Sequence, residues 1–207
     1  MLVMVFCEQG ESTGVTEELS TATDRDGLAA EIERLRSMIR GLEERVRQLD
    51  TLAHQDSLID LPNRRGFMRQ LDRLIDRVRR YGDKAAVLFV DIDGLKLIND
   101  SFGHLAGDKA LIQVAEFLSG GVRKSDCVAR LGGDEFGILL EHADEAVAQE
   151  TAQRLVDQVA GCELTFNGSL LGLSVAIGVA MIEPDDTPEK VIARADEAMY
   201  EVKSAAA

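Results

Sequence analysis

The stretch Arg130-Leu-Gly-Gly-Asp-Glu-Phe136 places two glycines directly before two acidic residues, and the apolar run Gly137-Ile-Leu-Leu140 follows it. Adjacent glycines allow a tight turn whose backbone can lie close against a ligand. The pattern predicts a β-hairpin, formed by residues 127–131 and 135–140, that carries two carboxylates at its tip. An ordinary surface turn is the alternative, because glycine and acidic residues are frequent in turns of any kind.

Composition limits the classes of partner that the chain can bind. Of the 207 residues, 45% are hydrophobic, which is enough to build one full-sized domain with an appended segment. The formal net charge of -14 argues against binding nucleic acid or an anionic membrane surface, since both require a basic field. A phosphate-bearing ligand would therefore need an accompanying cation.

The cysteines and the N-terminal residues favour a cytoplasmic protein. Cys7, Cys127 and Cys162 are scattered without metal-ligand spacing, which is typical of small apolar residues in a reducing compartment. Residues 1–7 are apolar, but they lack a basic start and are too short for a signal peptide or a membrane span. We therefore expect no membrane association.

A heptad pattern runs through residues 28–49, with β-branched residues in the a positions and leucine in the d positions. The seam consists of Leu28, Ile32, Leu35, Ile39, Leu42, Val46 and Leu49. This arrangement favours a parallel two-stranded coiled coil, and the flanking charges would be attractive between two chains, Glu31 with Arg36 and Arg45 with Asp50. A single amphipathic helix that lies on its own domain is the alternative.

Changes in composition divide the chain into three parts. Residues 1–26 are polar and lack periodicity after their apolar start, so we expect a flexible leader. Residues 27–54 form the predicted parallel dimeric stalk. The turn formers around Pro62 separate this stalk from a globular domain over residues 55–205.

Within the domain, residues 84–90 form a continuous apolar run, which predicts a central strand covered on both faces. An amphipathic helix is expected over residues 64–81. Further helices are expected over residues 107–118, 144–159 and 188–203, and further strands over residues 164–166 and 170–181. Strands interleaved with helices, some joined by hairpins, predict an α/β (α+β) sandwich whose central, largely antiparallel sheet is flanked by helices.

Acidic residues follow the central strand as Asp91-Ile92-Asp93, and alternation places both aspartates on one face of the chain. Magnesium prefers hard oxygen ligands and often lies between one or two carboxylates and substrate phosphates. Asp91 together with an acid of the hairpin could hold such an ion. The alternative is a polar turn of the kind that ends many strands.

The motif at residues 130–136 is accompanied by two further segments of distinctive sequence. They are Lys96-Leu-Ile-Asn-Asp-Ser-Phe-Gly-His-Leu-Ala-Gly-Asp108 and Asp56-Ser-Leu-Ile-Asp-Leu-Pro-Asn-Arg-Arg65. Together they resemble the signature set of the diguanylate cyclases, the GGDEF-domain family, over roughly residues 52–205. Several motifs in the right order are far more specific than any one of them. The family's Thr-Gly is replaced here by Ile59-Asp60, outside the metal and guanine positions.

The resemblance implies a GGDEF, nucleotidyl-cyclase-like fold and roles for the acidic residues. Asp91 and Asp134 match side-chain ligands of two catalytic magnesium ions, or manganese in their place, and the Ile92 carbonyl matches a further ligand. Glu135 matches the second acid of the motif, which binds metal or activates the attacking hydroxyl. Asp134 and Glu135 are therefore the expected catalytic acids.

The resemblance also implies substrate contacts. Asn99 and Asp108 match the pair that reads guanine, and a carboxylate can accept hydrogen bonds from guanine N1 and N2. Asp108 could instead cap the helix that begins beside it. Lys96 and Lys203 match lysines that contact the nucleotide phosphates, although Lys203 near a helix C-terminus also suits the helix dipole. We interpret His104 as structural.

In this family two GTP molecules form cyclic di-GMP and two pyrophosphates, each 3′-hydroxyl attacking the α-phosphate of the other nucleotide. Each domain holds one GTP, so the resemblance implies a homodimer, which the parallel coiled coil would hold together. Arg123-Lys-Ser-Asp126 lies five residues before the two glycines, where the family carries its Arg-x-x-Asp product-inhibition motif. Arg123 and Asp126 are therefore the expected allosteric inhibitory residues, with cyclic di-GMP as inhibitor.

Two other classes of function compete with an active cyclase. A catalytically silent domain could bind cyclic di-GMP through Arg123 and Asp126 as a receptor, although intact Asp134 and Glu135 argue against it. A coiled-coil interaction module with a passenger domain fits least, because the nucleotide site is complete. No sensor domain is recognisable before the stalk, so an unknown regulatory partner and constitutive activity both stay open.

Overall fold

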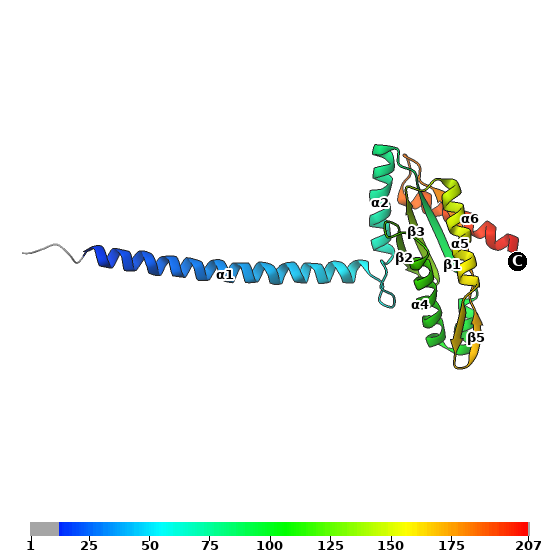
Figure 1. The fold of residues 1–207 in the computed structure, drawn as a ribbon, viewed down its shortest axis with the longest axis horizontal. Coiled ribbons are helices and arrows are strands. Elements are labelled where there is room, and N and C mark those ends of the chain that lie inside the picture. The colour runs from blue at the N-terminus through cyan, green and yellow to red at the C-terminus, as the bar shows by residue number, and fades with distance from the viewer. Residues whose placement is uncertain (1–12, 207) are drawn as a thin grey trace, which may run out of the picture. The chain divides into compact units, whose positions relative to one another are not determined.

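The computed structural model describes residues 13–206, with side chains described at positions 28, 30–48, 50 and 52–205. The chain divides into two compact units, one that ends at Asp50 and one that begins at Thr51. Figure 1 shows both units. The first twelve positions of the predicted leader lie outside the described residues.

A single helix, α1 (Thr13–His54), forms the described part of the first unit, and its last four residues belong to the second unit. Residues 13–26, which we expected to belong to a flexible leader, are helical. This stretch has no proline, and Glu17, Glu18, Leu19 and Ala22 have high helix propensity. Across the described residues, no helix is both long enough and apolar enough to span a membrane.

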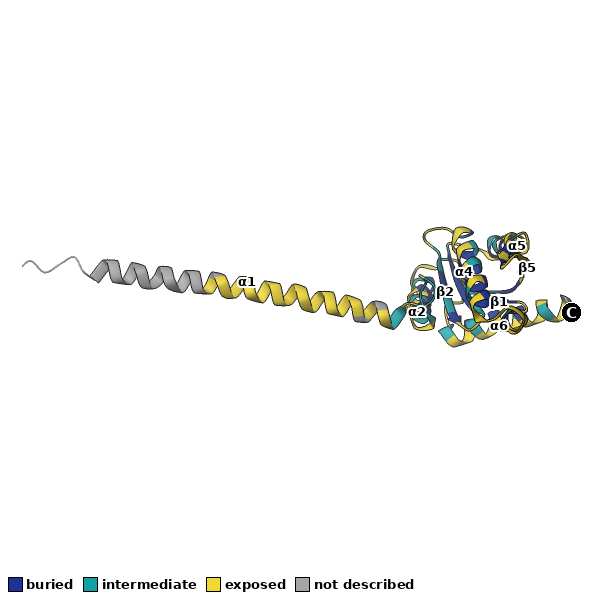
Figure 2. Cartoon of the chain, turned by 90° about the horizontal axis from the view of Figure 1, so that it is seen from below, coloured by how far each residue is buried: buried dark blue, intermediate teal, exposed yellow. Residues whose placement is uncertain are grey.

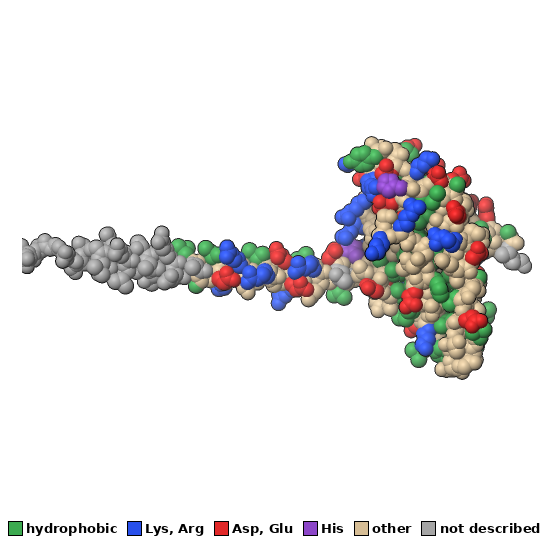
Figure 3. Space-filling view, viewed as in Figure 1, with side chains coloured by type: hydrophobic (Ala, Val, Ile, Leu, Met, Phe, Trp, Pro, Cys, Tyr) green, Lys and Arg blue, Asp and Glu red, His purple; other side chains and the backbone are tan. Residues whose placement is uncertain are grey.

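The predicted seam of the stalk is exposed along its described length (Figure 2). Its side chains are 45–65% exposed at Leu28, Ile32, Leu35, Ile39, Leu42 and Val46. Charged residues of both signs lie beside the seam (Figure 3), with ion pairs inside the helix between Arg34 and Glu31 at 2.9 Å and between Arg47 and Glu44 at 2.7 Å. A continuous exposed apolar stripe of this kind is suited to a partner helix.

The second unit is built on a four-stranded sheet in the order β2-β3-β1-β6, and every neighbouring pair is antiparallel. Its strands are β1 (Ala85–Ile92), β2 (Cys127–Gly132), β3 (Glu135–Glu141) and β6 (Val175–Met181). A separate hairpin pairs β4 (Glu163–Phe166) with β5 (Ser169–Gly172). The predicted central, antiparallel sheet is confirmed.

Helices cover both faces of the sheet, as the ribbon shows (Figure 1). They are α2 (Arg64–Tyr81), α3 (Leu95–Phe102), α4 (His104–Gly120), α5 (Glu145–Ala160) and α6 (Pro188–Ala206). Alternate residues of β1 enter two separate cores. Ala86, Leu88 and Val90 pack with α4 and α5, whereas Val87 and Phe89 pack with α2 and α6. Burial on both faces explains why β1 is apolar from Ala85 to Val90.

Candidate active site

The end of the central strand and the tip of the acidic hairpin lie side by side. Asp91 on β1 is the register partner of Glu135 on β3, and the Ile92 N–H donates to the Asp134 carbonyl at 3.1 Å. Between β2 and β3 the turn passes through two glycines with φ of 149° and 54°, the region that favours glycine. The structure therefore brings the four proposed metal-binding positions to one edge of the sheet.

Arg130 anchors this hairpin, a contact that sequence reasoning did not assign. Its Nε and Nη2 donate to the Gly133 carbonyl at 3.1 and 2.8 Å, and its Nη1 donates to the Asp56 carboxylate at 3.3 and 3.4 Å. Its own N–H donates to the Pro62 carbonyl at 2.9 Å. Because the Arg130 and Asp56 side chains are only 15% and 16% exposed, the pair is a well-shielded brace. Arg130 and Asp56 belong to two of the motifs quoted from the sequence, and their opposite charges were the signal that could have indicated this pair.

Next to the hairpin lies a pocket of about 470 Å³, lined by α3, α4 and the hairpin. Its walls include Lys96, Asn99, Asp108 and Asp134. Four of the predicted site residues, from three separate segments, thus face one cavity. His104, which we expected to be structural, is exposed and also lines this pocket.

The position of the Asn99 side chain depends on a close approach between α3 and α4. It lies directly over Gly107, where a Cβ atom would come within 2.1 Å of Asn99 Oδ1. Asp108 follows on the next residue of α4. The absence of a side chain at position 107 therefore lets an amide and a carboxylate occupy the same wall of the pocket.

The carboxylates at this edge repel one another. Burial raises the pKa of Asp91, and the charge of Asp134 adds to this, although the hydrogen bond from Lys203 acts in the opposite direction. Burial likewise raises the pKa of Glu135, reinforced by the charge of Asp91 and opposed by that of Arg64. A cation bound between these carboxylates would offset their mutual repulsion and stabilise their ionised forms. The arrangement therefore favours the binding of a cation.

Lys203, in the last turn of α6, is the cation in contact with Asp91. Its Nζ donates to the Asp91 carboxylate and also lies 3.6 Å from Asp93 Oδ1. Asp93 is held in turn by the Ser174 hydroxyl, which donates to it at 2.8 Å. Burial alone would lower the pKa of Lys203, but the hydrogen bond and charges of the aspartates outweigh it, so the pKa is raised.

The donor set suits magnesium or manganese. Among the described residues, no group of three acidic, histidine or cysteine side chains is arranged to hold a metal ion by itself. Magnesium does not require one, because it usually binds one or two carboxylates and completes its shell with water and substrate phosphates. The carboxylates of Asp91, Asp134 and Glu135, with the Ile92 carbonyl, supply only hard oxygen ligands at one edge. These residues fit such an ion.

Arg123 and Asp126 lie apart from these groups, on the loop before β2. Both carboxylate oxygens of Asp126 accept backbone N–H groups, from Arg123 at 2.9 Å and from Glu141 at 3.1 Å. Arg123 is exposed and lines a pocket of about 230 Å³ together with Arg154 of α5. The structure thus gives Asp126 a loop-holding role and leaves the Arg123 side chain at the surface.

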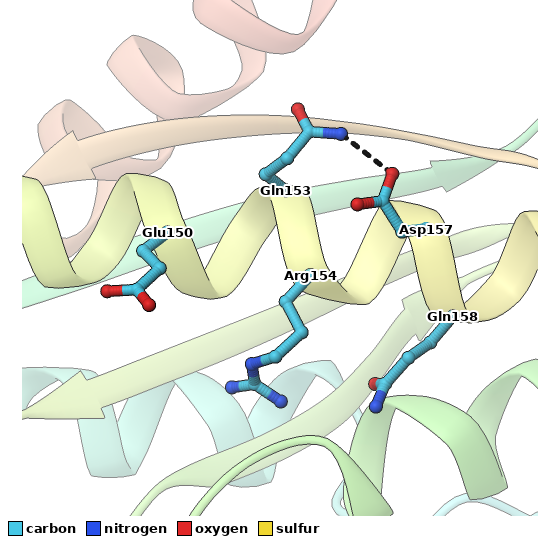
Figure 4. Close-up of a pocket in the computed structure, with 5 residues that line it drawn as sticks. All are labelled: Glu150, Gln153, Arg154, Asp157 and Gln158. Carbon is cyan, nitrogen blue, oxygen red and sulfur yellow. Dashed lines mark hydrogen bonds between the residues drawn. The ribbon is translucent and has the colours of Figure 1, made fainter.

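A larger hollow, of about 530 Å³, lies along α5 and does not include any residue of the hairpin. Figure 4 shows its lining, in which Gln153 donates to Asp157 at 2.9 Å and the Arg154 side chain extends away from this pair. Arg154 donates to the Gly121 carbonyl at 2.7 Å. Because one helix face supplies the whole lining, the hollow lacks the converging polar groups of a substrate site.

Residues 53–207 match the family model described as diguanylate cyclase, GGDEF domain. The chain is 37% identical over 200 residues to diguanylate cyclase TpbB of Pseudomonas aeruginosa, and 36% identical over 197 residues to response regulator PleD of Caulobacter vibrioides. These matches cover 96% and 92% of this chain but only 45% and 43% of the relatives.

A solved structure is similar as well. It is that of the coiled coil and GGDEF domain of DgcB from Caulobacter crescentus in complex with c-di-GMP, with a TM-score of 0.80 and 26% identity, covering 86% of this chain and 95% of that one. The family match over most of the chain, together with these relatives, shows that the chain belongs to the diguanylate cyclase, GGDEF-domain family.

Proposed function

We propose that this chain condenses two GTP molecules into cyclic di-GMP and two pyrophosphates. The observation that carries the proposal is the pocket in which Lys96, Asn99 and Asp108 face Asp134 of the acidic hairpin. It offers groups suited to a guanine base at one end and to phosphates and a divalent ion at the other. Relatives named as diguanylate cyclases support the same activity.

Asp108 and Asn99 would select the base. A carboxylate accepts hydrogen bonds from guanine N1–H and N2–H, a donor pattern that adenine does not present, and the Asn99 amide can both donate and accept. Their placement on one wall, with Asn99 over Gly107, suits recognition of a base edge. GTP rather than ATP is the expected substrate.

Asp91, Asp134 and Glu135, with the Ile92 carbonyl, would hold two magnesium ions, or manganese. When bound, the ions would neutralise charge on the phosphates and polarise the reacting oxygens. Lys96 in the pocket and Lys203 beside Asp91 would add positive charge at the phosphates. In a chain with a net charge of -14, such cations are required to hold a triphosphate.

The reaction requires two chains. A 3′-oxygen of one GTP forms a bond to the α-phosphorus of the other, pyrophosphate leaves, and the hydroxyl proton passes to a carboxylate of the hairpin. The same exchange in the opposite direction closes the ring. Orientation of the two nucleotides supplies much of the rate, so a parallel coiled coil through α1 would place the two pockets face to face.

Cyclic di-GMP would also inhibit the enzyme through Arg123. Its guanidinium is exposed at a pocket, and its fork suits a phosphate or the Hoogsteen edge of guanine. Asp126 would contribute by holding the loop through its two backbone hydrogen bonds. The DgcB structure with c-di-GMP supports binding of this product by the fold.

A turnover assay tests the proposal. Purified chain is incubated with GTP and magnesium, and cyclic di-GMP is separated by chromatography, with Asp134→Ala beside it. Asp185→Ala, an exposed aspartate away from the pocket, is the matched control. We expect product from the native chain and the control and none from Asp134→Ala. Cyclic di-GMP binding without any turnover would instead identify a receptor.

A further inference from the structure

The Asp91 carboxylate is the partner of Lys203 and is also a proposed ligand of the metal ions. The ammonium donates to Asp91 and lies 3.6 Å from Asp93, so it is placed between the two acidic residues that follow β1. The Asp91 side chain is 18% exposed and that of Lys203 is 33% exposed, so the contact is partly shielded from water. A helix C-terminus alone would not require this contact, because the dipole acts on any cation of the last turn.

A carboxylate oxygen that accepts a hydrogen bond from an ammonium group has fewer lone pairs for a metal ion. Two cations on one carboxylate also repel each other, most strongly where water is partly excluded. Full coordination by Asp91 therefore requires the Lys203 ammonium to withdraw. Asp93, fixed by Ser174, offers a second acceptor toward which it can move.

We propose that Lys203 is a competing cation that neutralises Asp91 until a divalent ion displaces it. The displaced ammonium is then free for the phosphates that arrive with the ion. This inference rests on the proposed function, since it assumes that Asp91 binds metal. The inference adds that metal binding changes a contact of α6, because Lys203, the residue that must move, belongs to the last turn of that helix.

The inference predicts opposite effects of one substitution. Without added metal, Lys203→Met leaves Asp91 beside Asp134 and Asp93 without its counter-charge, so the chain should melt at a lower temperature. With the competitor removed, a divalent ion should bind more tightly. Because partly exposed ion pairs are weak, the expected gain in affinity is about two- to fivefold. A purely structural lysine would lower stability without any gain in metal affinity.

The inference is tested by titrating the protein with Mn²⁺ in the absence of nucleotide. Electron paramagnetic resonance measures the concentration of the free ion and so gives the affinity. The proteins are the native chain, Lys203→Met, and Lys96→Met as matched control, since Lys96 on α3 lines the pocket that includes Asp134. Asp91→Asn identifies the site by loss of binding. We expect tighter binding in Lys203→Met and no tightening in Lys96→Met.

Equal or weaker binding in Lys203→Met, with binding still lost in Asp91→Asn, would overturn the inference alone. Unchanged binding in Asp91→Asn would overturn both it and the metal site of the proposed function. Lys203→Gln, which keeps a polar side chain of similar length, is measured in parallel after circular dichroism has confirmed its fold. It must show the same tightening, so the test stands if Lys203→Met does not fold.

Discussion

Arg130 controls the geometry of the hairpin at the scale of a single residue. Three of its guanidinium nitrogens contact either the Gly133 carbonyl or the Asp56 carboxylate, immediately before Asp134. Lysine keeps the charge but cannot reproduce a planar fork with several donors. The position of the Asp134 carboxylate therefore depends on Arg130, which also lines the pocket.

Arg130→Lys is expected to lower the free energy of unfolding by about 1–3 kcal/mol, because shielded, charge-assisted hydrogen bonds are lost. Urea unfolding followed by circular dichroism measures this. Arg65→Lys, at an exposed position of α2, is the control and should change stability by less than about 0.5 kcal/mol. Equal stability of both variants would refute the anchoring role.

Glu135 is expected to make stability depend on pH. Because burial and the charge of Asp91 raise its pKa in the folded chain, the folded state disfavours the ionised form. The resulting loss of stability is absent below the ordinary carboxyl pKa and develops as the pH rises through the raised value. In chelator, Glu135→Gln should therefore melt at a higher temperature than the native chain at about pH 7, and this difference should shrink toward about pH 4.

Differential scanning calorimetry across that range checks the sign. Glu189→Gln, an exposed acid in the first turn of α6, is the control and should show no such gain at neutral pH. A lower melting temperature for Glu135→Gln at neutral pH would show that its ionised form is stabilising instead. The interpretation that the carboxylates at this edge repel one another in the folded chain would then be wrong.

At the scale of elements, the contact between α3 and α4 positions the guanine pair. A methyl group at position 107 would meet the far end of the Asn99 side chain, which can rotate away, so the fold should survive. Gly107→Ala is therefore expected to raise the KM for GTP by about threefold to tenfold, the cost of one displaced hydrogen bond, with little loss of stability.

Steady-state kinetics with GTP measure this effect. Gly120→Ala, in the same helix with nothing within 4 Å of the added methyl, is the matched control and should leave the KM unchanged. Helix propensity favours alanine at both positions, so it cannot explain a difference between them. An unchanged KM for GTP in Gly107→Ala would refute the proposal that Asn99 binds the guanine base.

Local patterns predicted elements better than they predicted contacts. The helix expected over residues 64–81 is α2 with the same bounds, because an amphipathic period and the Asn63 cap both act locally. Helix α3 was missed, since its eight residues are too few for a clear period. The segment 170–181 divides between β5 and β6, which belong to different sheets, and only long-range pairing decides this.

The candidate site follows the same distinction. The motifs named its carboxylates, lysines and Asn99, and the pocket brings four of these residues together. The brace between Arg130 and Asp56 and the contact of Lys203 with Asp91 join residues 74 and 112 positions apart. No local pattern contains such pairs, because they depend on how the segment before α2 meets β2 and on the packing of α6 against β1.

At the scale of the whole molecule, the exposed seam of α1 is expected to make the chain a dimer. Ile39→Lys places a charge in an a position that would be buried between two helices, so it should yield monomers. Gly41→Lys adds the same charge where nothing lies within 4 Å and outside the seam, and it should stay dimeric. Sedimentation equilibrium distinguishes these results, and a dimeric Ile39→Lys variant would refute the seam.

The requirement for two facing chains is tested most directly by the rate of cyclic di-GMP formation per chain, measured over a range of concentrations of Ile39→Lys. For a demonstrably monomeric variant, we predict a rate per chain that is far below that of the native chain and rises in proportion to concentration. Product and pyrophosphate should form in a ratio of one to two. A monomer whose rate per chain equals the native rate and does not change with concentration would contradict the proposed reaction between two chains.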